Sequence, residues 1–166
     1  VDALCREIEA TKPFFAKYRS FYIGGGTPVS LPTDSLEKIL KTIGKPGTEY
    51  TVEAGRPDCI NDETLALLKE YGVTRICVNP QTFNDKTLVE IGRKPTAKDI
   101  FDKYALAKKY GFDINMDLIA GLPGESLNDF KYSVDAAAEL SPENVTVHTL
   151  SLKKGSVLKE KVERLA

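Results

Sequence analysis

Short runs of apolar and β-branched residues alternate along the chain with longer segments whose apolar residues recur at helical spacing. The short runs predict five strands, at residues 20–24, 49–54, 75–79, 113–119 and 144–150. Strands that alternate with helices predict an α/β fold with a parallel sheet and right-handed crossovers. Residues 75–78 and 145–147 are almost continuously apolar or β-branched, which predicts strands covered on both faces.

The segments between these strands carry recognisable helix ends. The chain opens in a helical pattern, and glycines at positions 72 and 111 are placed to stop two of the later helices. The expected first residues or caps are Thr33 or Asp34, Asn61, Thr96 with Asp99, and Ser126 with Asp129, the last two pairs resembling capping boxes.

Polar or glycine-rich residues stand at the carboxyl end of almost every predicted strand. The first strand runs into Gly24, Gly25 and Gly26, followed by Thr27 and Pro28. Consecutive glycines free the backbone to adopt positive φ and let a ligand approach the main chain. Taken alone, the glycine run is explained equally well by a tight turn. The arrangement as a whole is typical of a (β/α) barrel, or part of one, with its site at these strand ends.

Three further polar side chains are expected at comparable strand ends: Glu53, Gln81 and Asp117. Each also has a purely structural explanation. Glu53 can pair with Arg56, Gln81 can cap the following turn, and Asp117 can satisfy backbone groups. Three such side chains beside the glycine run nevertheless favour a ligand site, since carboxylates are rarely buried without a partner.

A single ligand with an ammonium group, a carboxylate, a ribose and a base suits this set of residues chemically. The glycine backbone and the two carboxylates accept hydrogen bonds, the glutamine does either, and Arg93 can hold a carboxylate. The only histidine, His148, lies between apolar strand positions. We expect a buried, hydrogen-bonded, neutral imidazole there in preference to a metal ligand, because no second histidine or paired cysteine is nearby.

Charge and cysteine content narrow the class of function. A formal net charge of −1 gives no electrostatic case for a nucleic-acid partner. No apolar run approaches the length of a membrane span, and no signal-peptide pattern opens the chain. Cys5, Cys59 and Cys77 match no disulfide, zinc or cluster spacing, which indicates reduced thiols in the cytoplasm, with Cys77 as a small apolar residue inside a strand. Because the chain begins without methionine, we expect it to be the interior of a longer protein.

Four motifs stand in the order found in a known family. They are Gly-Gly-Gly-Thr-Pro at 24–28, Val-Glu-Ala-Gly-Arg-Pro at 52–57, Asn-Pro-Gln-Thr at 79–82, and Asn-Met-Asp-Leu-Ile-Ala-Gly-Leu-Pro-Gly-Glu at 115–125. They resemble the radical S-adenosylmethionine (SAM) enzymes and, within them, the oxygen-independent coproporphyrinogen III oxidases (coproporphyrinogen dehydrogenases). The similarity covers residues 4–160 and includes Val-His-Thr-Leu-Ser-Leu-Lys-Lys-Gly-Ser at 147–156.

The resemblance implies a six-stranded partial barrel, similar to a TIM barrel, with SAM and a [4Fe–4S] cluster at the carboxyl ends of its strands. Residues 1–166 would form a single domain of it, with the first strand before Val1. The residues that the resemblance assigns to the cofactor are Gly24, Gly25 and Gly26 at its methionine end, the following Thr27, Glu53, Gln81, Arg93 and Asp117 at its polar groups, and Ile119 or its neighbours on the adenine.

In such enzymes an electron donor reduces the cluster, which cleaves SAM to a 5′-deoxyadenosyl radical. The radical abstracts hydrogen from the propionates of coproporphyrinogen III, a tetrapyrrole, and oxidative decarboxylation yields protoporphyrinogen IX in haem biosynthesis. Three alternatives remain open. They are a haem-trafficking protein (haem chaperone) of the same superfamily, a radical enzyme acting on another substrate such as transfer RNA, and an unrelated (β/α) barrel with purely structural glycines.

One feature departs from the family pattern. The Cys-x-x-x-Cys-x-x-Cys cluster motif is absent from these 166 residues, so we expect the cluster cysteines upstream of Val1. We therefore predict that the 166-residue chain by itself binds no cluster and is catalytically inert. A barrel without its first strand is also expected to expose a sheet edge at residues 20–24, which favours pairing with another copy.

Overall fold

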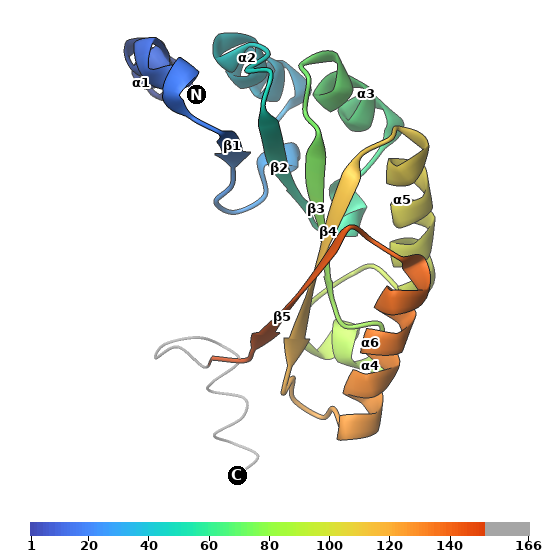
Figure 1. The fold of residues 1–166 in the computed structure, drawn as a ribbon. Coiled ribbons are helices and arrows are strands. Elements are labelled where there is room, and N and C mark those ends of the chain that lie inside the picture. Colours follow the sequence, from blue (N-terminus) through green and yellow to red (C-terminus); the bar gives the residue numbers. More distant parts are fainter. Residues whose placement is uncertain (152–166) are drawn as a thin grey trace.

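A curved parallel sheet forms the centre of the molecule in the computed structural model, which describes residues 1–151 (Figure 1). The strands follow one another across the sheet in the order β1-β2-β3-β4-β5, and every neighbouring pair is parallel. The sheet curls into a half-barrel. Its strands are β1 (Ser20–Ile23), β2 (Glu49–Gly55), β3 (Arg75–Gln81), β4 (Asp113–Ala120) and β5 (Asn144–Thr149). All five predicted strands are confirmed, with ends shifted by two residues or fewer.

The helices lie on the outer side of this curve, and the inner side carries none among the described residues (Figure 1). The α-helices are α1 (Asp2–Thr11), α2 (Thr33–Ile43), α3 (Asp62–Glu70), α4 (Asp85–Glu90), α5 (Ala97–Lys109) and α6 (Leu127–Leu140). Short 3₁₀ turns are η1 (Lys12–Lys17), η2 (Pro28–Ser30) and η3 (Pro57–Cys59). Helix α4, a single short helix after β3, has no counterpart among the predicted helices.

The predicted helix caps are confirmed. The Asn61 side chain accepts from the Thr64 backbone at the start of α3, and α2 begins at Thr33. Both capping boxes are complete, at the starts of α5 and α6. Local sequence thus determines where these helices begin, because each cap satisfies backbone N–H groups that have no partner within the helix.

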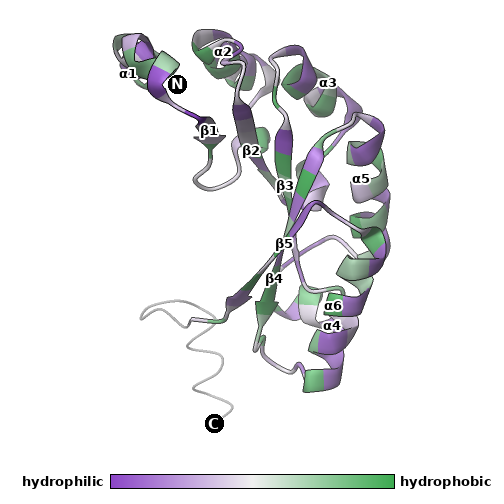
Figure 2. Ribbon diagram, in the orientation of Figure 1, coloured by the Kyte–Doolittle hydropathy of each residue, from purple (hydrophilic) through white to green (hydrophobic). Residues whose placement is uncertain are grey.

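The two faces of the sheet differ in chemistry, because successive side chains of a strand point to opposite faces. On the outer face, Val52, Ile76 and Ile114 are fully buried under the helices. The inner face receives the alternate residues of the strands, of which Glu53 and Asn115 stay partly exposed while Thr51 and Cys77 are buried. Hydrophilic and hydrophobic residues accordingly follow one another along β3 and β4 (Figure 2). Polar groups are therefore concentrated on the open side of the half-barrel.

Strand β5 departs from the sequence prediction. Val145 and Val147 are 39% and 51% exposed, so the prediction that this strand is covered on both faces was wrong. It is the last strand of the described sheet, and no described helix follows it to cover its outer face. The prediction of a buried His148 was wrong for a related reason. The residue is exposed, because it lies on the open inner face of the same edge strand.

At the other end of the sheet, β1 pairs with β2 alone among the described strands. Association of a second copy along this edge stays a prediction. Within residues 1–151, no helix combines the length and the apolar character that crossing a membrane requires. Residues 152–156 of the 147–156 motif, and the end of the predicted domain at residue 166, lie outside the described residues.

Candidate functional site

A cleft of about 380 Å³ lies on the inner face of the half-barrel. Its walls come from all five strands, because each strand places alternate side chains on this face. The residues lining the cleft are Tyr22 of β1, Glu49, Thr51 and Glu53 of β2, Arg75 and Cys77 of β3, Asn115 and Asp117 of β4, and Thr146 and His148 of β5. Two of the predicted site residues, Glu53 and Asp117, therefore reach the same cleft.

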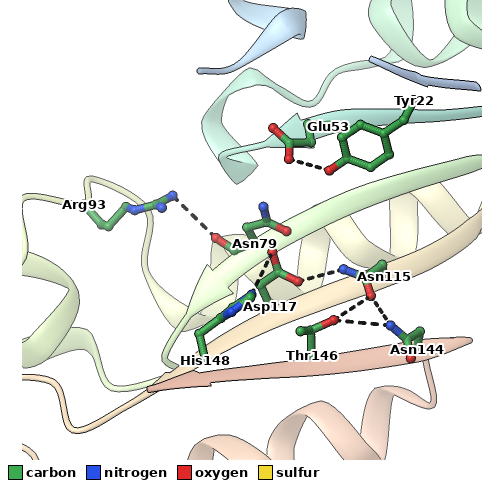
Figure 3. Close-up of polar contacts among 9 residues, drawn as sticks. All are labelled: Tyr22, Glu53, Asn79, Arg93, Asn115, Asp117, Asn144, Thr146 and His148. Carbon is green, nitrogen blue, oxygen red and sulfur yellow. Dashed lines mark hydrogen bonds and ion pairs between the residues drawn. The ribbon is translucent and has the colours of Figure 1, made fainter. Parts of the chain in front are cut away.

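Glu53 lies at the middle level of this cleft. It is paired across the sheet with Cys77, and Cys77 is paired with Asn115. The Glu53 carboxylate accepts a hydrogen bond from the Tyr22 hydroxyl (Figure 3). Arg56, the alternative partner, lies 3.8 Å from Asp58 through its Nε atom instead. Glu53 is thus part of the cleft and not of a local ion pair with Arg56.

Asp117 lies one step nearer the carboxyl ends of the strands, opposite Thr146. Its Oδ1 accepts from Asn115 Nδ2 at 2.7 Å, and its Oδ2 lies 3.9 Å from His148 Nε2. Asn115 is held in turn by hydrogen bonds from Asn144 and from Thr146, the latter at 3.2 Å (Figure 3). The partners of Asp117 are therefore side chains of the inner face, and backbone groups do not account for its position.

Gln81 lies apart from these two carboxylates. It ends β3 opposite Leu118, beyond the level of Glu53 and Asp117, and it adopts a left-handed φ of 71°. Its Oε1 is buried and has no hydrogen-bond partner among the described residues. Gln81 does not cap the following turn, and it is the Asn84 side chain that caps α4. The structure thus leaves Gln81 with an acceptor available near the strand ends but outside the residues that line the cleft.

Arg93 points back toward the end of β3. Its Nη1 lies 3.4 Å from the Asn79 carbonyl oxygen (Figure 3). Burial, with a contribution from nearby Arg56, lowers the pKa of Arg93, yet a guanidinium remains charged at neutral pH. Asn79 Oδ1 is a second buried acceptor without a partner among the described residues. Ile119, the remaining predicted residue, is half-buried opposite His148.

The glycine run forms an open loop after β1. Gly25 and Gly26 have φ values of 87° and 65°, which only glycine adopts without strain. A Cβ built at either position would meet nothing within 4 Å. Thr27 anchors the loop to the end of β2, since a Cβ at Gly55 would lie 3.2 Å from Thr27 Cγ2. None of the three glycines lines the cleft, but Gly24 adjoins Glu53, so the loop presents bare backbone beside it.

A buried hydrogen-bond cluster on the other side of the site escaped the sequence reasoning. Thr82 Oγ1 donates to Glu125 Oε1 at 2.5 Å and lies 3.0 Å from Ser133 Oγ, which also accepts from the Phe83 backbone. Thr82 and Ser133 are 0% and 1% exposed. We call Thr82, Glu125 and Ser133 the loop clamp, because they join the loops that follow β3 and β4.

The residues present fit SAM. Its ammonium and hydroxyl groups need acceptors, which the carboxylates of Glu53 and Asp117 and the unpartnered oxygens of Asn79 and Gln81 offer. Its carboxylate needs a cation, and Arg93 is a cation near these strand ends. The open glycine loop adds unobstructed backbone.

The residues present do not fit an iron–sulfur cluster. Cys5 is buried in α1, Cys59 ends η3, and Cys77 is buried in β3. Within residues 1–151, no three His, Cys, Asp or Glu side chains gather where they could hold a metal ion. Cys77 is a small buried strand residue, as predicted, although its side of β3 faces the cleft.

Comparison with known proteins yields one consistent group. A family model described as the radical SAM superfamily matches residues 1–137. The oxygen-independent coproporphyrinogen-III oxidase-like protein HemZ of Bacillus subtilis is 42% identical over 89% of this chain and 31% of its own length. The heme chaperone HemW of the same organism is 38% identical over 84% of this chain and 38% of its own length.

Solved structures share the fold. Coproporphyrinogen III oxidase (HemN) from Escherichia coli, a radical SAM enzyme, matches with a TM-score of 0.79 at 25% identity, over 99% of this chain and 44% of that chain. Archaeal Elp3 from Methanocaldococcus infernus matches with a TM-score of 0.76 at 19% identity, over 87% of this chain and 40% of that chain, which shows the fold alone. The chain spans less than half the length of each of these relatives.

Proposed function

Because the chain belongs to the radical SAM superfamily, we propose that its inner face is the SAM-binding part of a longer coproporphyrinogen dehydrogenase. The single observation that carries this proposal is the convergence of two carboxylates, Glu53 and Asp117, on one cleft beside an open glycine loop. Each carboxylate is held by a side-chain hydrogen bond, Glu53 by Tyr22 of the neighbouring strand and Asp117 by Asn115 of its own strand.

Each group has a defined part in binding. Glu53 and Asp117 accept hydrogen bonds from the ammonium and hydroxyl groups of the ligand, and the backbone of Gly25 and Gly26 lies against its methionine end. Arg93 neutralises the ligand carboxylate, and Gln81 supplies a further acceptor. Ile119 covers the adenine. SAM bound beside a [4Fe–4S] cluster supplies one-electron radical chemistry, and this chain's own task is to orient the ligand and to shield it from water.

Coproporphyrinogen as substrate rests on the named relatives. The 42% identity to an oxidase-like protein and the fold match to coproporphyrinogen III oxidase support it. A second candidate is a haem-binding chaperone, and the 38% identity to HemW specifically favours it. Both candidates need the same SAM site, so the residues of the inner face are compatible with either. No observation among the described residues favours transfer RNA as the substrate.

Turnover by the longer natural protein separates the two candidates. The reconstituted protein is incubated without oxygen with SAM, a reductant and coproporphyrinogen III, and porphyrin products are followed by chromatography. We expect protoporphyrinogen IX to form, and its formation to fall sharply in Asp117→Asn. Stoichiometric haem binding with no turnover would contradict the oxidase and support the chaperone.

The 166-residue chain by itself serves as the matched control for the cluster. We expect iron and sulfide analysis after anaerobic reconstitution to find no stoichiometric four-iron centre in it, because no three metal-ligating side chains gather within residues 1–151. A four-iron centre in this chain would contradict the expected position of the cluster cysteines upstream of Val1.

A further inference from the structure

The orientation of Glu53 depends on a tyrosine of the neighbouring strand. Tyr22 pairs with Thr51, two residues before Glu53, so both side chains stand on the inner face. The Tyr22 ring extends along the sheet and its hydroxyl donates to Glu53 Oε1 (Figure 3). In the described part of the chain this hydroxyl is the one donor to the carboxylate, which leaves the second oxygen, Oε2, as an acceptor beside the cleft.

Gly24 leaves the space that this ring needs. A Cβ built there would stand 2.5 Å from Tyr22 Cε1 and 3.3 Å from Glu53 Cδ. The neighbouring Gly25 and Gly26 differ, because they have positive φ values and open space around them. Gly24 needs no left-handed backbone, so the crowding by Tyr22 and Glu53 is what excludes a side chain at this position.

The surroundings keep Tyr22 a donor. Desolvation of the hydroxyl in the cleft raises the pKa of Tyr22, and the hydrogen bond to Glu53 adds to the increase, so the group stays protonated at neutral pH. Cys77 lies at the same level of the sheet as Glu53 and is 5% exposed. Burial raises the pKa of its thiol, the neighbouring Tyr22 and Asn115 side chains partly oppose this, and the carboxylates of Asp117 and Glu53 add to the increase. The phenol is therefore the group that fixes the carboxylate, and the thiol beneath it stays neutral.

We propose that Tyr22 and Gly24 are positioning residues of the inner-face site: the glycine makes room for the ring, and the ring hydroxyl fixes Glu53 so that its second oxygen serves the ligand. The identity of that ligand as SAM rests on the proposed function. The positioning itself is a property of the chain without ligand, and each part has its own measurement.

The first measurement uses the ligand-free chain. The ¹³C resonance of the Glu53 side-chain carboxyl carbon, assigned by its loss in Glu53→Gln, is recorded in Tyr22→Phe and Gly24→Ala. We expect the resonance to shift in both variants, because one removes the donor and the other displaces the ring. Tyr132→Phe is the control, since Tyr132 is an exposed tyrosine of α6 whose hydroxyl makes no hydrogen bond among the described residues. An unmoved resonance in both variants would overturn the proposal, whatever the chain binds.

The second measurement is a double-mutant cycle on SAM binding by calorimetry. Tyr22→Phe is expected to weaken binding about fivefold, less than the loss of a direct charged hydrogen bond, because Tyr22 orients Glu53 and does not itself contact the ligand. In the Glu53→Gln background the same change is expected to have no further effect, because Tyr22 acts through Glu53. Equal losses in both backgrounds would overturn the positioning role.

A third pair of variants tests Gly24. Gly24→Ala is expected to weaken SAM binding about tenfold, because the ring must move. In a Tyr22→Ala background the ring is gone and only the milder contact with Glu53 remains, so adding Gly24→Ala is expected to cost much less than in the wild type. A full additional loss there would show that Gly24 acts without Tyr22, against the proposal. A wild-type chain that binds no SAM, while the Glu53 resonance still responds, would contradict the proposed function and leave the positioning supported.

Discussion

The two sides of the inner-face site are built differently. On the side of β1 and β2, Gly25 and Gly26 stand free of neighbours, and a single tyrosine hydroxyl holds Glu53. On the side of β3 and β4, the loops are tied together by the loop clamp, whose threonine and serine are almost fully buried. The buried clamp supports the loops on the side of β3 and β4, where one end of a ligand can be fixed in place. The bare glycine backbone on the side of β1 and β2 leaves room for the other end to enter.

The largest expected effect is a loss of stability on the side of the loop clamp. Thr82→Val removes the hydroxyl that Glu125, Ser133 and the Asn84 backbone share, and leaves the Glu125 carboxylate without that donor. We expect a loss of about 2 kcal/mol in the free energy of unfolding, the usual cost of removing a partner from a charged hydrogen bond. Urea unfolding measures it.

The control for this prediction is Thr42→Val, at a partly exposed threonine of α2 whose hydroxyl bonds to its own helix at Lys38. A surface change of this kind is expected within about 0.5 kcal/mol of the wild type. Equal stability of the two variants would mean that the buried cluster does not join the loops.

The glycine side is expected to respond more in binding than in stability. Gly25→Ala forces a side chain to φ 87°, and we expect it to lose about 1 kcal/mol of stability. Its Cβ would also occupy the open backbone beside the cleft, so we expect SAM binding to weaken about tenfold, or about 1.4 kcal/mol.

Gly47 is the matched control, because it has φ 69°, also has nothing within 4 Å of a built Cβ, and lies before β2, away from the carboxyl ends of the strands. Gly47→Ala should lose similar stability and no affinity. If both variants bind equally well in calorimetry, the glycine loop is a turn and not part of a site.

The smallest expected effect is on the stability of the fold at acidic pH. Hydrogen bonds from the Ser126 side chain and backbone lower the pKa of Asp129, and Asn84 of the β3–α4 loop adds to them. A depressed folded-state pKa contributes stability above the unfolded value of about 3.9, and that contribution is lost as the pH falls through the folded value. Stability should therefore fall below about pH 4, with a shallower fall in Asp129→Asn.

Asp99 is the comparison residue, because Thr96 lowers its pKa in the same way at the start of α5, away from the clamp. Both Asp→Asn variants should flatten the acid limb measured by urea unfolding at several pH values. Only Asp129→Asn should accelerate amide exchange at the start of α4, where Asn84 lies. Identical amide exchange in the two variants would show that Asp129 does not support the start of α4.

Local signals in the sequence predicted the framework well. The strand runs, the cap at Asn61 and the two capping boxes involve residues at most a few positions apart, and the structure confirms them. The alternation of side chains also held the information that Glu53, Asn115 and Asp117 share one face. The alternation did not give the position of each residue along its strand relative to the neighbouring strands. A bulge before Gln81 places that residue beyond the level of Glu53 and Asp117.

The missed features are long-range contacts. Thr82 and Glu125 are 43 residues apart, and Tyr22 and Glu53 are 31 apart, so no local pattern marks either pair. Glu53 and Glu125 lie within recognised motifs. For Tyr22 the one available signal was the alternation of side chains along β1, which places this residue on the inner face. His148 was wrongly predicted as buried because apolar neighbours suggest burial only where the sheet continues or a helix covers it.

The central claim is that the inner face binds SAM through its two carboxylates. Its most direct test is calorimetry of SAM with the wild-type chain, Asp117→Asn and the surface variant Asp102→Asn. We predict saturable, one-to-one binding that Asp102→Asn retains and that Asp117→Asn weakens at least tenfold, as expected for a charged hydrogen bond. Absence of saturable binding by the wild type, or equal affinity in the two variants, would contradict the claim.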